Sequence, residues 1–328
     1  MKTTIKTLLT LLLAGSITFS MIACNTPTED SVGDTTTSSA PITTTSPITT
    51  DSKPEPPAPV SPMETLAKLP GVVSLTRYEG EMPADTVGYE MIFHSGENGE
   101  LKIAADIVLP VNFEKGNASL IFYFPEVGLT MKDVARLLVS RRIGVVRFYA
   151  RGTGNSEGIS DVGGTEMMDA LTLFSLCEEA GLTANRRNYV AGSSSGSIKA
   201  LRMAAELGDA VDGVSVTNIV SDLAKYLDAR GENFIISHAA LIGGTAAEMP
   251  EAYQFRSACY FADKFKCPVL FIEYTKNTQF FPTEQYDLFE EALKNTNVTY
   301  ERYKINDKGS DFVGEAGQKM LSWIESHG

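Results

Sequence analysis

Histidine, tryptophan and cysteine are scarce in this sequence of 328 residues, which contains three, one and four of them respectively. The cysteines are Cys24, Cys177, Cys259 and Cys267. Neither they nor the histidines show the spacing of a metal site, so no metal and no cofactor is predicted. Cys177 falls within a helical pattern, which predicts a packed thiol. A disulfide between Cys259 and Cys267 stays open, because sequence alone does not fix disulfide connectivity.

Basic residues are also few, since 28 Lys and Arg stand against 41 Asp and Glu. Once Lys2 and Lys6 are lost with the N-terminal leader described next, the excess of acidic residues is 15. A surface this acidic repels phosphate groups and anionic lipid headgroups. Nucleic acid is therefore excluded as a partner, and so is electrostatic docking to an anionic membrane.

The N-terminus carries the features of a secretion signal. Lys2 and Lys6 precede an apolar run from Leu8 to Leu13, which is on the short side for a membrane span. The following Met21-Ile22-Ala23-Cys24 resembles the bacterial lipobox. The resemblance implies cleavage before Cys24 and attachment of diacylglycerol to its sulfur, whereas an ordinary signal peptide is the alternative. We expect an exported protein, anchored by lipid alone to the outer face of a bacterial membrane.

Three segments are expected along the chain. Residues 1–23 form the signal peptide, and residues 24–61 form a tether rich in Thr, Ser and Pro. The tether has almost no large apolar residue, so it cannot bury enough surface to offset the entropy of ordering, and we expect it to be disordered. Residues 62–328 form one folded domain.

The domain alternates predicted strands with predicted helices. Two strands flank the turn signal Glu97-Asn98-Gly99 and predict a hairpin. The pattern predicts an α/β fold, in which helices cover both faces of a mostly parallel sheet and the antiparallel hairpin lies at one edge. Residues 221–266 read as a longer irregular section that can form a small cap. The predicted strands span 88–95, 101–109, 119–124, 143–149, 189–191, 211–217, 268–272 and 299–305, and helices are predicted around 131–140, 167–174, 198–205, 284–294 and 317–326.

The stretch from Asn188 to Gly196 reads Asn-Tyr-Val-Ala-Gly-Ser-Ser-Ser-Gly. A short apolar run ends there, and Ile198, Leu201 and Ala205 follow with the spacing of one helix face. The sequence G-x-S-x-G between a strand and a helix is the nucleophile elbow of the α/β-hydrolases. Ser194 is therefore the candidate nucleophile, with the N-terminus of a helix behind it to favour negative charge.

Residues from about 88 to 328 resemble the prolyl-oligopeptidase/dipeptidyl-peptidase-like branch of the α/β-hydrolases. Four motifs besides the elbow carry the resemblance, and they occur in the order that this branch shows. They are Arg151–Gly158 (R-G-x-G-x-S-x-G), Glu251–Tyr253 with Ser257, Lys266–Leu270 (K-x-P-V-L) and Pro282–Gln285 (P-x-E-Q). The resemblance implies the α/β-hydrolase fold and acyl transfer to a serine.

The resemblance also implies an oxyanion hole, built by the backbone N–H groups of Ser195 and Val127. The turn that holds Val127 departs from the family pattern, because Pro125-Glu126 stands where members often carry His-Gly. A carboxylate at Glu126 would oppose a developing oxyanion, unless the side chain points outward into solvent.

Two positions of the implied catalytic triad have lost their usual residues. Asn277 stands at the acid position, where the family has Asp, and Ser310 stands at the His position. A shift of the alignment does not restore the triad, because no histidine lies between His238 and His327. The proton of Ser194 therefore has no base at the usual place.

Other residues are alternatives for the missing base and acid. His238 lies in the section expected to form a cap and is the alternative base, although a lone histidine more often has a structural role. Asp222 is the alternative acid, although capping a helix suits it better. The carboxylates that could reach the mouth of the site are Glu126, Glu273, Asp307 and Asp311, but a carboxylate is a weak base for a serine hydroxyl.

Three functions remain open on these grounds. The first is a degenerate α/β-hydrolase, displayed at the cell surface, that binds a small-molecule or peptide ligand in the elbow pocket with little or no turnover. The second is an active serine esterase or peptidase that acts through Ser194 with a relocated base. The third is a purely structural lipoprotein, which leaves the elbow unexplained. The fold does not decide among them.

Overall fold

The computed structural model describes residues 60–327, except for 114–117, 126–128, 139–140 and 310–313. One compact unit spans Ala58–Gly328. Within the described residues, every helix is too short or too polar to span a bilayer. Several of the predicted positions lie outside the described residues: the lipidation site Cys24, the signal peptide, nearly all of the tether, Glu126, Val127, Ser310 and Asp311.

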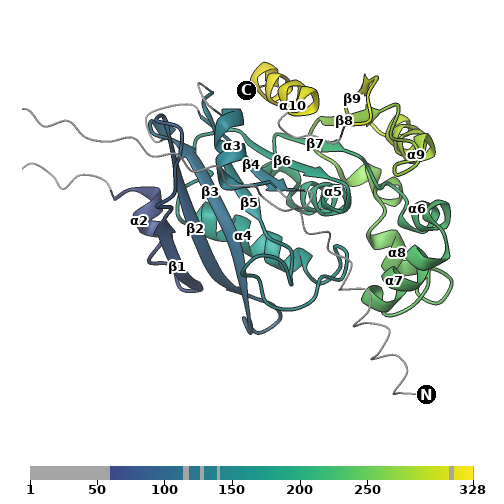
Figure 1. Ribbon diagram of the computed structural model, residues 1–328, viewed down its shortest axis with the longest axis horizontal. Helices are drawn as coiled ribbons and strands as arrows, with labels where there is room; N and C mark the ends of the chain where they lie inside the picture. The colour runs from purple at the N-terminus through teal and green to yellow at the C-terminus, as the bar shows by residue number, and fades with distance from the viewer. Residues whose placement is uncertain (1–59, 114–117, 126–128, 139–140, 310–313, 328) are drawn as a thin grey trace, which may run out of the picture. The chain divides into compact units, whose positions relative to one another are not determined.

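Nine strands form one sheet in the order β1-β2-β3-β5-β4-β6-β7-β8-β9 (Figure 1). The pairs β1–β2, β2–β3 and β3–β5 are antiparallel, and every other neighbouring pair is parallel. The mostly parallel sheet of the sequence analysis is therefore confirmed. The strands are β1 (Val72–Arg77), β2 (Thr86–Ser95), β3 (Leu101–Pro110), β4 (Ser119–Phe124), β5 (Ile143–Phe148), β6 (Asn188–Ser193), β7 (Gly213–Thr217), β8 (Val269–Tyr274) and β9 (Tyr300–Ile305).

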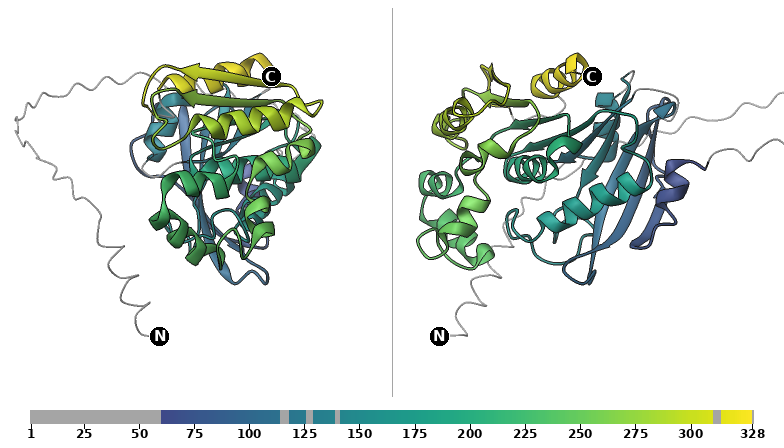
Figure 2. Two further views of the ribbon diagram at one scale, coloured as in Figure 1. Left: turned by 90° about the vertical axis from the view of Figure 1, so that its right-hand side faces the viewer. Right: turned by 180° about the vertical axis from the view of Figure 1, so that it is seen from behind.

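Helices lie on both sides of the sheet (Figure 2). The alternating side chains of the central strand β4 show how two cores arise. Leu120 and Phe122 pack in the core that holds α4 (Met167–Glu179), α5 (Ser195–Leu207) and α9 (Thr283–Lys294). Ile121 and Tyr123 point to the opposite core, under α3 (Met131–Leu138) and α10 (Glu315–His327). A strand that is buried on both faces reads as a continuous apolar run, which is why β4 was predictable.

The predicted hairpin is present, because Ser95 of β2 pairs with Leu101 of β3. It is not the edge of the sheet, since β1 pairs with the outer side of β2. The sequence analysis missed β1 and also the short helix α2 (Pro62–Leu66) before it. The residues of β1 are half-buried or exposed, so its apolar pattern is too weak to identify.

The section from 221 to 266 is mostly helical, and the prediction of an irregular section was wrong. It contains α6 (Leu223–Arg230), α7 (Glu232–Ile242), α8 (Pro250–Phe255) and two 3₁₀ turns. Gly231, with φ of 91°, separates α6 from α7. The apolar residues of α7 follow no single helical face, and none of its residues is buried. Its sequence therefore lacked the periodicity by which helices are recognised.

The R-G-x-G-x-S-x-G motif ties three elements together. Arg151 donates to both carboxylate oxygens of Asp169 on α4, at 2.6 and 2.9 Å. Asp169 is fully buried and also accepts a hydrogen bond from the Ser95 hydroxyl at 2.7 Å. These contacts hold the loop after β5 against α4 and the end of β2, so the motif serves the fold.

Cys177, Cys259 and Cys267 are free thiols in the structure, so the open question of a Cys259–Cys267 disulfide is answered. Burial raises the pKa of each thiol to about 12. All three are therefore protonated at neutral pH and are poor nucleophiles. Within the described part of the chain, no group of three or more His, Cys, Asp or Glu side chains could hold a metal ion.

Candidate active site

Ser194 lies in the sharp turn between β6 and α5, as the motif predicts. Its backbone has φ of 56° and ψ of −126°, which is rare for a residue other than glycine. Such a conformation costs about 1–3 kcal/mol and persists only where the surrounding structure fixes it. Here the Ser194 N–H donates to the Thr217 carbonyl at 3.2 Å, and the Ser194 carbonyl accepts from the Ser197 N–H at 2.9 Å.

The two glycines of the motif are required by the space around them. A Cβ atom added to Gly192 would lie 2.3 Å from the carbonyl oxygen of Gly196. A Cβ added to Gly196 would lie 2.2 Å from the carbonyl oxygen of Phe124, at the end of β4. Because both obstacles are backbone atoms of the central sheet and the elbow, neither side chain is possible without moving the elbow.

A cavity of about 170 Å³ opens beside Ser194. Ser195, whose N–H is the implied oxyanion donor, also contributes to its wall, but Asn277 and Asp222 do not. The remaining wall comes from α5, α6, α7 and the loops after β5 and β7. The lining residues are Val162, Ser194, Ser195, Ile198, Val220, Leu223, Tyr226, Phe234 and His238. The structure thus brings His238, the alternative base, to the same cavity as the candidate nucleophile.

His238 is held by its own helix. Its Nδ1 lies 2.9 Å from the carbonyl oxygen of Phe234, one turn earlier on α7, and its ring stacks on the Phe234 ring. A carbonyl oxygen only accepts, so Nδ1 carries the proton and Nε2 keeps a free lone pair. Burial lowers the pKa of His238, which favours the neutral ring. A neutral imidazole with a free Nε2 is the form that a general base requires.

The lowered pKa of His238 is expected to make the protein less stable in mild acid. The unfolded state binds a proton at a pKa of about 6.5, and the folded state binds it only at lower pH. The stability that this difference provides is present above about pH 6.5 and is lost as the pH falls below it. Urea unfolding at pH 7.5 and 5.5 measures the loss, and we expect His238→Gln to show a smaller loss than the wild type. Asn233→Gln, on an exposed residue of the same helix, should keep the wild-type difference; equal losses in all three proteins would contradict the assignment.

Asn277 follows β8, where the resemblance implies the triad acid. Its side-chain amide donates to the Oδ1 atom of Asn218 at 3.4 Å. Asn218 is fully buried just after β7 and has φ of 48°. A pair of neutral amides therefore lies at the position where the resemblance implies a carboxylate that orients the triad histidine.

The alternative carboxylates have other partners. Glu273 was predicted to reach the mouth of the site, and this was wrong: it is 2% exposed and accepts from Arg302 at 2.8 and 2.9 Å. The Asp222 carboxylate accepts from the Lys225 N–H at 3.1 Å and thereby caps α6. Asp307 is exposed, and its carboxylate accepts from the N–H of the next residue at 2.6 Å.

The histidines other than His238 are not part of the cavity wall. His94 is exposed on β2, where it pairs with Lys102 of β3. The Nδ1 atom of His327 bonds to the Trp323 carbonyl at 2.8 Å near the end of α10.

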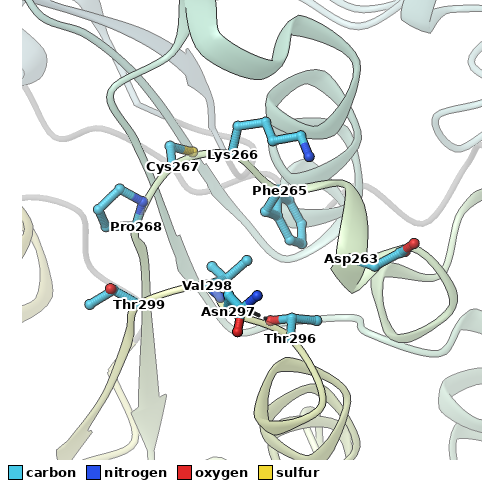
Figure 3. Close-up of a pocket in the computed structure, with 9 residues that line it drawn as sticks. All are labelled: Asp263, Phe265, Lys266, Cys267, Pro268, Thr296, Asn297, Val298 and Thr299. Carbon is cyan, nitrogen blue, oxygen red and sulfur yellow. Dashed lines mark hydrogen bonds between the residues drawn. The ribbon is translucent and has the colours of Figure 1, made fainter.

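A larger hollow, of about 440 Å³, lies before β8 and β9 (Figure 3). Lys266, Cys267 and Thr299 are among the residues that line it. This hollow is at the amino ends of the parallel strands, whereas Ser194 is at a carboxyl end. Ligands of open α/β sheets bind outside the carboxyl ends. We therefore take the smaller cavity beside Ser194 as the candidate site.

Comparison with known proteins supports the same reading of the fold. No family model matches the chain. Acetyl xylan esterase 1 from Thermoanaerobacterium sp. JW/SL YS485 is 17% identical with a TM-score of 0.57, covering 81% of this chain and 91% of that one. A puromycin-hydrolyzing peptidase from Mycobacterium tuberculosis is 21% identical with a TM-score of 0.57, covering 74% of this chain and 39% of that one. The chain has the α/β-hydrolase fold.

A sequence relative points to the same class of protein. The α/β-hydrolase-fold chain is 30% identical over 156 residues to the uncharacterized peptidase YtmA of Bacillus subtilis (strain 168). The match covers 48% of this chain and 60% of the relative. The chain therefore resembles esterases and peptidases in structure and a peptidase in sequence.

Proposed function

We propose that this chain is an exported, lipid-anchored protein of the α/β-hydrolase fold that binds a small-molecule or peptide ligand beside Ser194 and hydrolyses esters or peptides only slowly. The observation that carries the proposal is the pairing of Asn277 with Asn218 next to a complete elbow. The strained backbone at Ser194 also supports ligand binding in the pocket. Such strain lowers the stability of the folded protein, and it is found mostly at functional sites. The esterases and peptidases among the similar structures supply the class of substrate.

Slow turnover follows from the loss of the triad. Removing the histidine of a Ser-His-Asp triad costs about a millionfold in kcat, and binding together with the oxyanion hole still leaves about a thousandfold over water. Ser194 keeps the helix N-terminus of α5 behind it and the N–H of Ser195 beside it. It lacks the carboxylate that would hold a base in the required tautomer, because Asn277 is neutral.

Hydrolysis of p-nitrophenyl butyrate and of a peptide p-nitroanilide tests the proposal. For the protein without residues 1–24 we expect a kcat about a millionfold below the typical enzyme value of about 10 s⁻¹. Ser194→Ala should leave this residual rate about unchanged, because the residual rate comes from binding and the oxyanion hole. A kcat in the ordinary range for serine esterases would contradict the proposal.

The lipid anchor is tested separately, because Cys24→Ala should move the full-length protein from the membrane fraction to the soluble fraction.

A second candidate function is a working serine hydrolase in which His238 is the base. It is favoured by the shared cavity of His238 and Ser194 and by the free Nε2 atom. In this scheme Nε2 takes the proton of the Ser194 hydroxyl, and the Phe234 carbonyl holds the tautomer in place of an acid. His238→Gln distinguishes the two candidates: the rate falls to that of Ser194→Ala if His238 is the base, and is otherwise unchanged.

A further inference from the structure

We propose that the cavity beside Ser194 admits one uncharged apolar group, about the size of a butyl to hexyl chain or a single phenyl ring. The group is the acyl or alkyl part of the ligand, which places the ester or amide carbonyl near Ser194. This inference rests on the proposed function in one respect only, namely that the ligand reaches Ser194. Its size, polarity and rigidity come from the walls of the cavity.

The volume of the cavity sets the size of the group. An apolar cavity of about 150 Å³ in another protein binds benzene, and this one has about 170 Å³. An acetyl group would leave most of the space empty, and a long fatty chain exceeds it. Pockets that enclose a whole drug-sized ligand usually have about 300–1,000 Å³. One group of the ligand enters this cavity, and the rest stays outside.

The chemistry of the walls sets the polarity of the group. Six of the nine described lining residues are aliphatic or aromatic, and the other three are Ser194, Ser195 and His238. Among the lining residues that the structure describes, there is no Asp, Glu, Lys or Arg to pair with a buried charge. Because an unpaired charge loses its hydration on entry, these walls favour an uncharged group over a carboxylate or an ammonium group. The aliphatic and aromatic residues are Val162, Ile198, Val220, Leu223, Tyr226 and Phe234.

One wall of the cavity is held in a fixed position by buried contacts. Val162 has φ of 60°, an unusual conformation for a β-branched residue. The carboxylate of Glu166, which is fully buried, accepts from the Gly163 N–H at 2.6 Å and from the Ser160 hydroxyl at 2.8 Å. Lys199 of α5 lies 3.3 Å from the same carboxylate. These contacts hold the loop against the helix that begins at the elbow, so this wall of the cavity is in place before a ligand arrives.

A series of alkyl fluorophosphonates with methyl, butyl, hexyl and dodecyl groups on phosphorus tests the size. In the reaction a bond forms between the Ser194 Oγ atom and phosphorus, the P–F bond breaks, and fluoride and the serine proton leave. We expect the labelling rate, followed by intact mass, to rise by about fourfold for each methylene up to butyl or hexyl and to fall at dodecyl. A rate that is highest for methyl, or independent of length, would overturn the proposal.

A second measurement does not depend on the reactivity of Ser194. Benzene at millimolar concentration should raise the melting temperature of both the wild type and Ser194→Ala, whereas benzoate should not. If benzene stabilises the protein but no phosphonate labels it, the proposal of slow turnover at Ser194 is contradicted and the cavity proposal is supported. If benzene gives no shift, or no larger shift than benzoate, the cavity proposal fails whatever Ser194 does.

Two phenylalanines provide a matched pair of variants. The rings of Phe234 and Phe280 both lie against the guanidinium of Arg230, at 4.4 and 4.8 Å, and both are partly exposed. Of the two, Phe234 lines the cavity. Phe234→Ala should widen the cavity and move the best phosphonate from hexyl toward dodecyl, while Phe280→Ala should keep the wild-type order. The same order in all three proteins would contradict the assignment of this cavity.

Discussion

Replacing Gly196 by alanine is expected to lower the free energy of unfolding by on the order of 4 kcal/mol, which is large for a single substitution. The added Cβ atom would lie 2.2 Å from the Phe124 carbonyl oxygen and 3.0 Å from its carbon. Phe124 ends β4, which is paired on both sides in the sheet. Since neither backbone can move away cheaply, the variant must distort the elbow or the sheet.

A control substitution at Gly181 distinguishes the steric clash at Gly196 from the general loss of stability on replacing a glycine. Gly181 has φ of 79°, and a Cβ added there would meet no atom within 4 Å. Gly181→Ala should therefore lose only the strain of a left-handed conformation, about 1 kcal/mol. Urea unfolding of both variants measures the two losses. Equal losses would mean that the close approach of Gly196 to β4 is not what requires a glycine.

Replacing Arg302 by methionine should cost about 3–5 kcal/mol of stability, because it leaves a buried carboxylate without its main partner. The Arg302 guanidinium donates to Glu273 at 2.8 and 2.9 Å, and Glu273 is 2% exposed. It also donates to Glu290 at 2.8 Å and to Asp287 at 2.7 Å, both on α9. The cluster joins β8 and β9 to α9.

The matched control for Arg302 is a pair near the surface. Arg141 lies 2.6 Å from Glu325, whose side chain is about half exposed. Arg141→Met should cost no more than about 1 kcal/mol, the usual upper value for an exposed pair. The double variant Arg302→Met with Glu273→Met should recover stability, because it removes the unpaired buried charge. A loss at Arg302 no larger than that at Arg141 would contradict the importance of the buried cluster.

Most strands of the sheet could be predicted from the sequence, but the helices between residues 221 and 266 could not. Strands such as β4 are buried on both faces, and their apolar runs are unmistakable. The edge strand β1 has no such run, because one neighbour and partial burial are enough to hold it. The helix α7 is apolar on several faces without burying any residue, so periodicity could not identify it. Its position depends on packing against α6 and on the glycine between them.

The candidate site likewise contains some residues that the sequence identifies and others that it does not. Ser194 and its glycines belong to one local motif, so the sequence contained the elbow complete. Whether His238 approaches the cavity depends on how α7 packs over the elbow, and no local sequence pattern predicts that packing. Glu273 was misplaced because its neighbour Tyr274 ends β8 at the correct edge, and only the alternation along the strand shows that Glu273 points to Arg302. Val162 and Phe234 gave no signal at all, since apolar residues in a loop or a cap usually serve packing.

Labelling of the protein without residues 1–24 with a simple fluorophosphonate tests the central claim most directly, with Ser194→Ala as control and intact mass as readout. If the elbow is complete but has no efficient base, we expect partial labelling over hours in the wild type and none in Ser194→Ala. Stoichiometric labelling within minutes that disappears in Ser194→Ala would show that a working base acts on Ser194. That result would contradict the account in which Asn277 marks a lost triad.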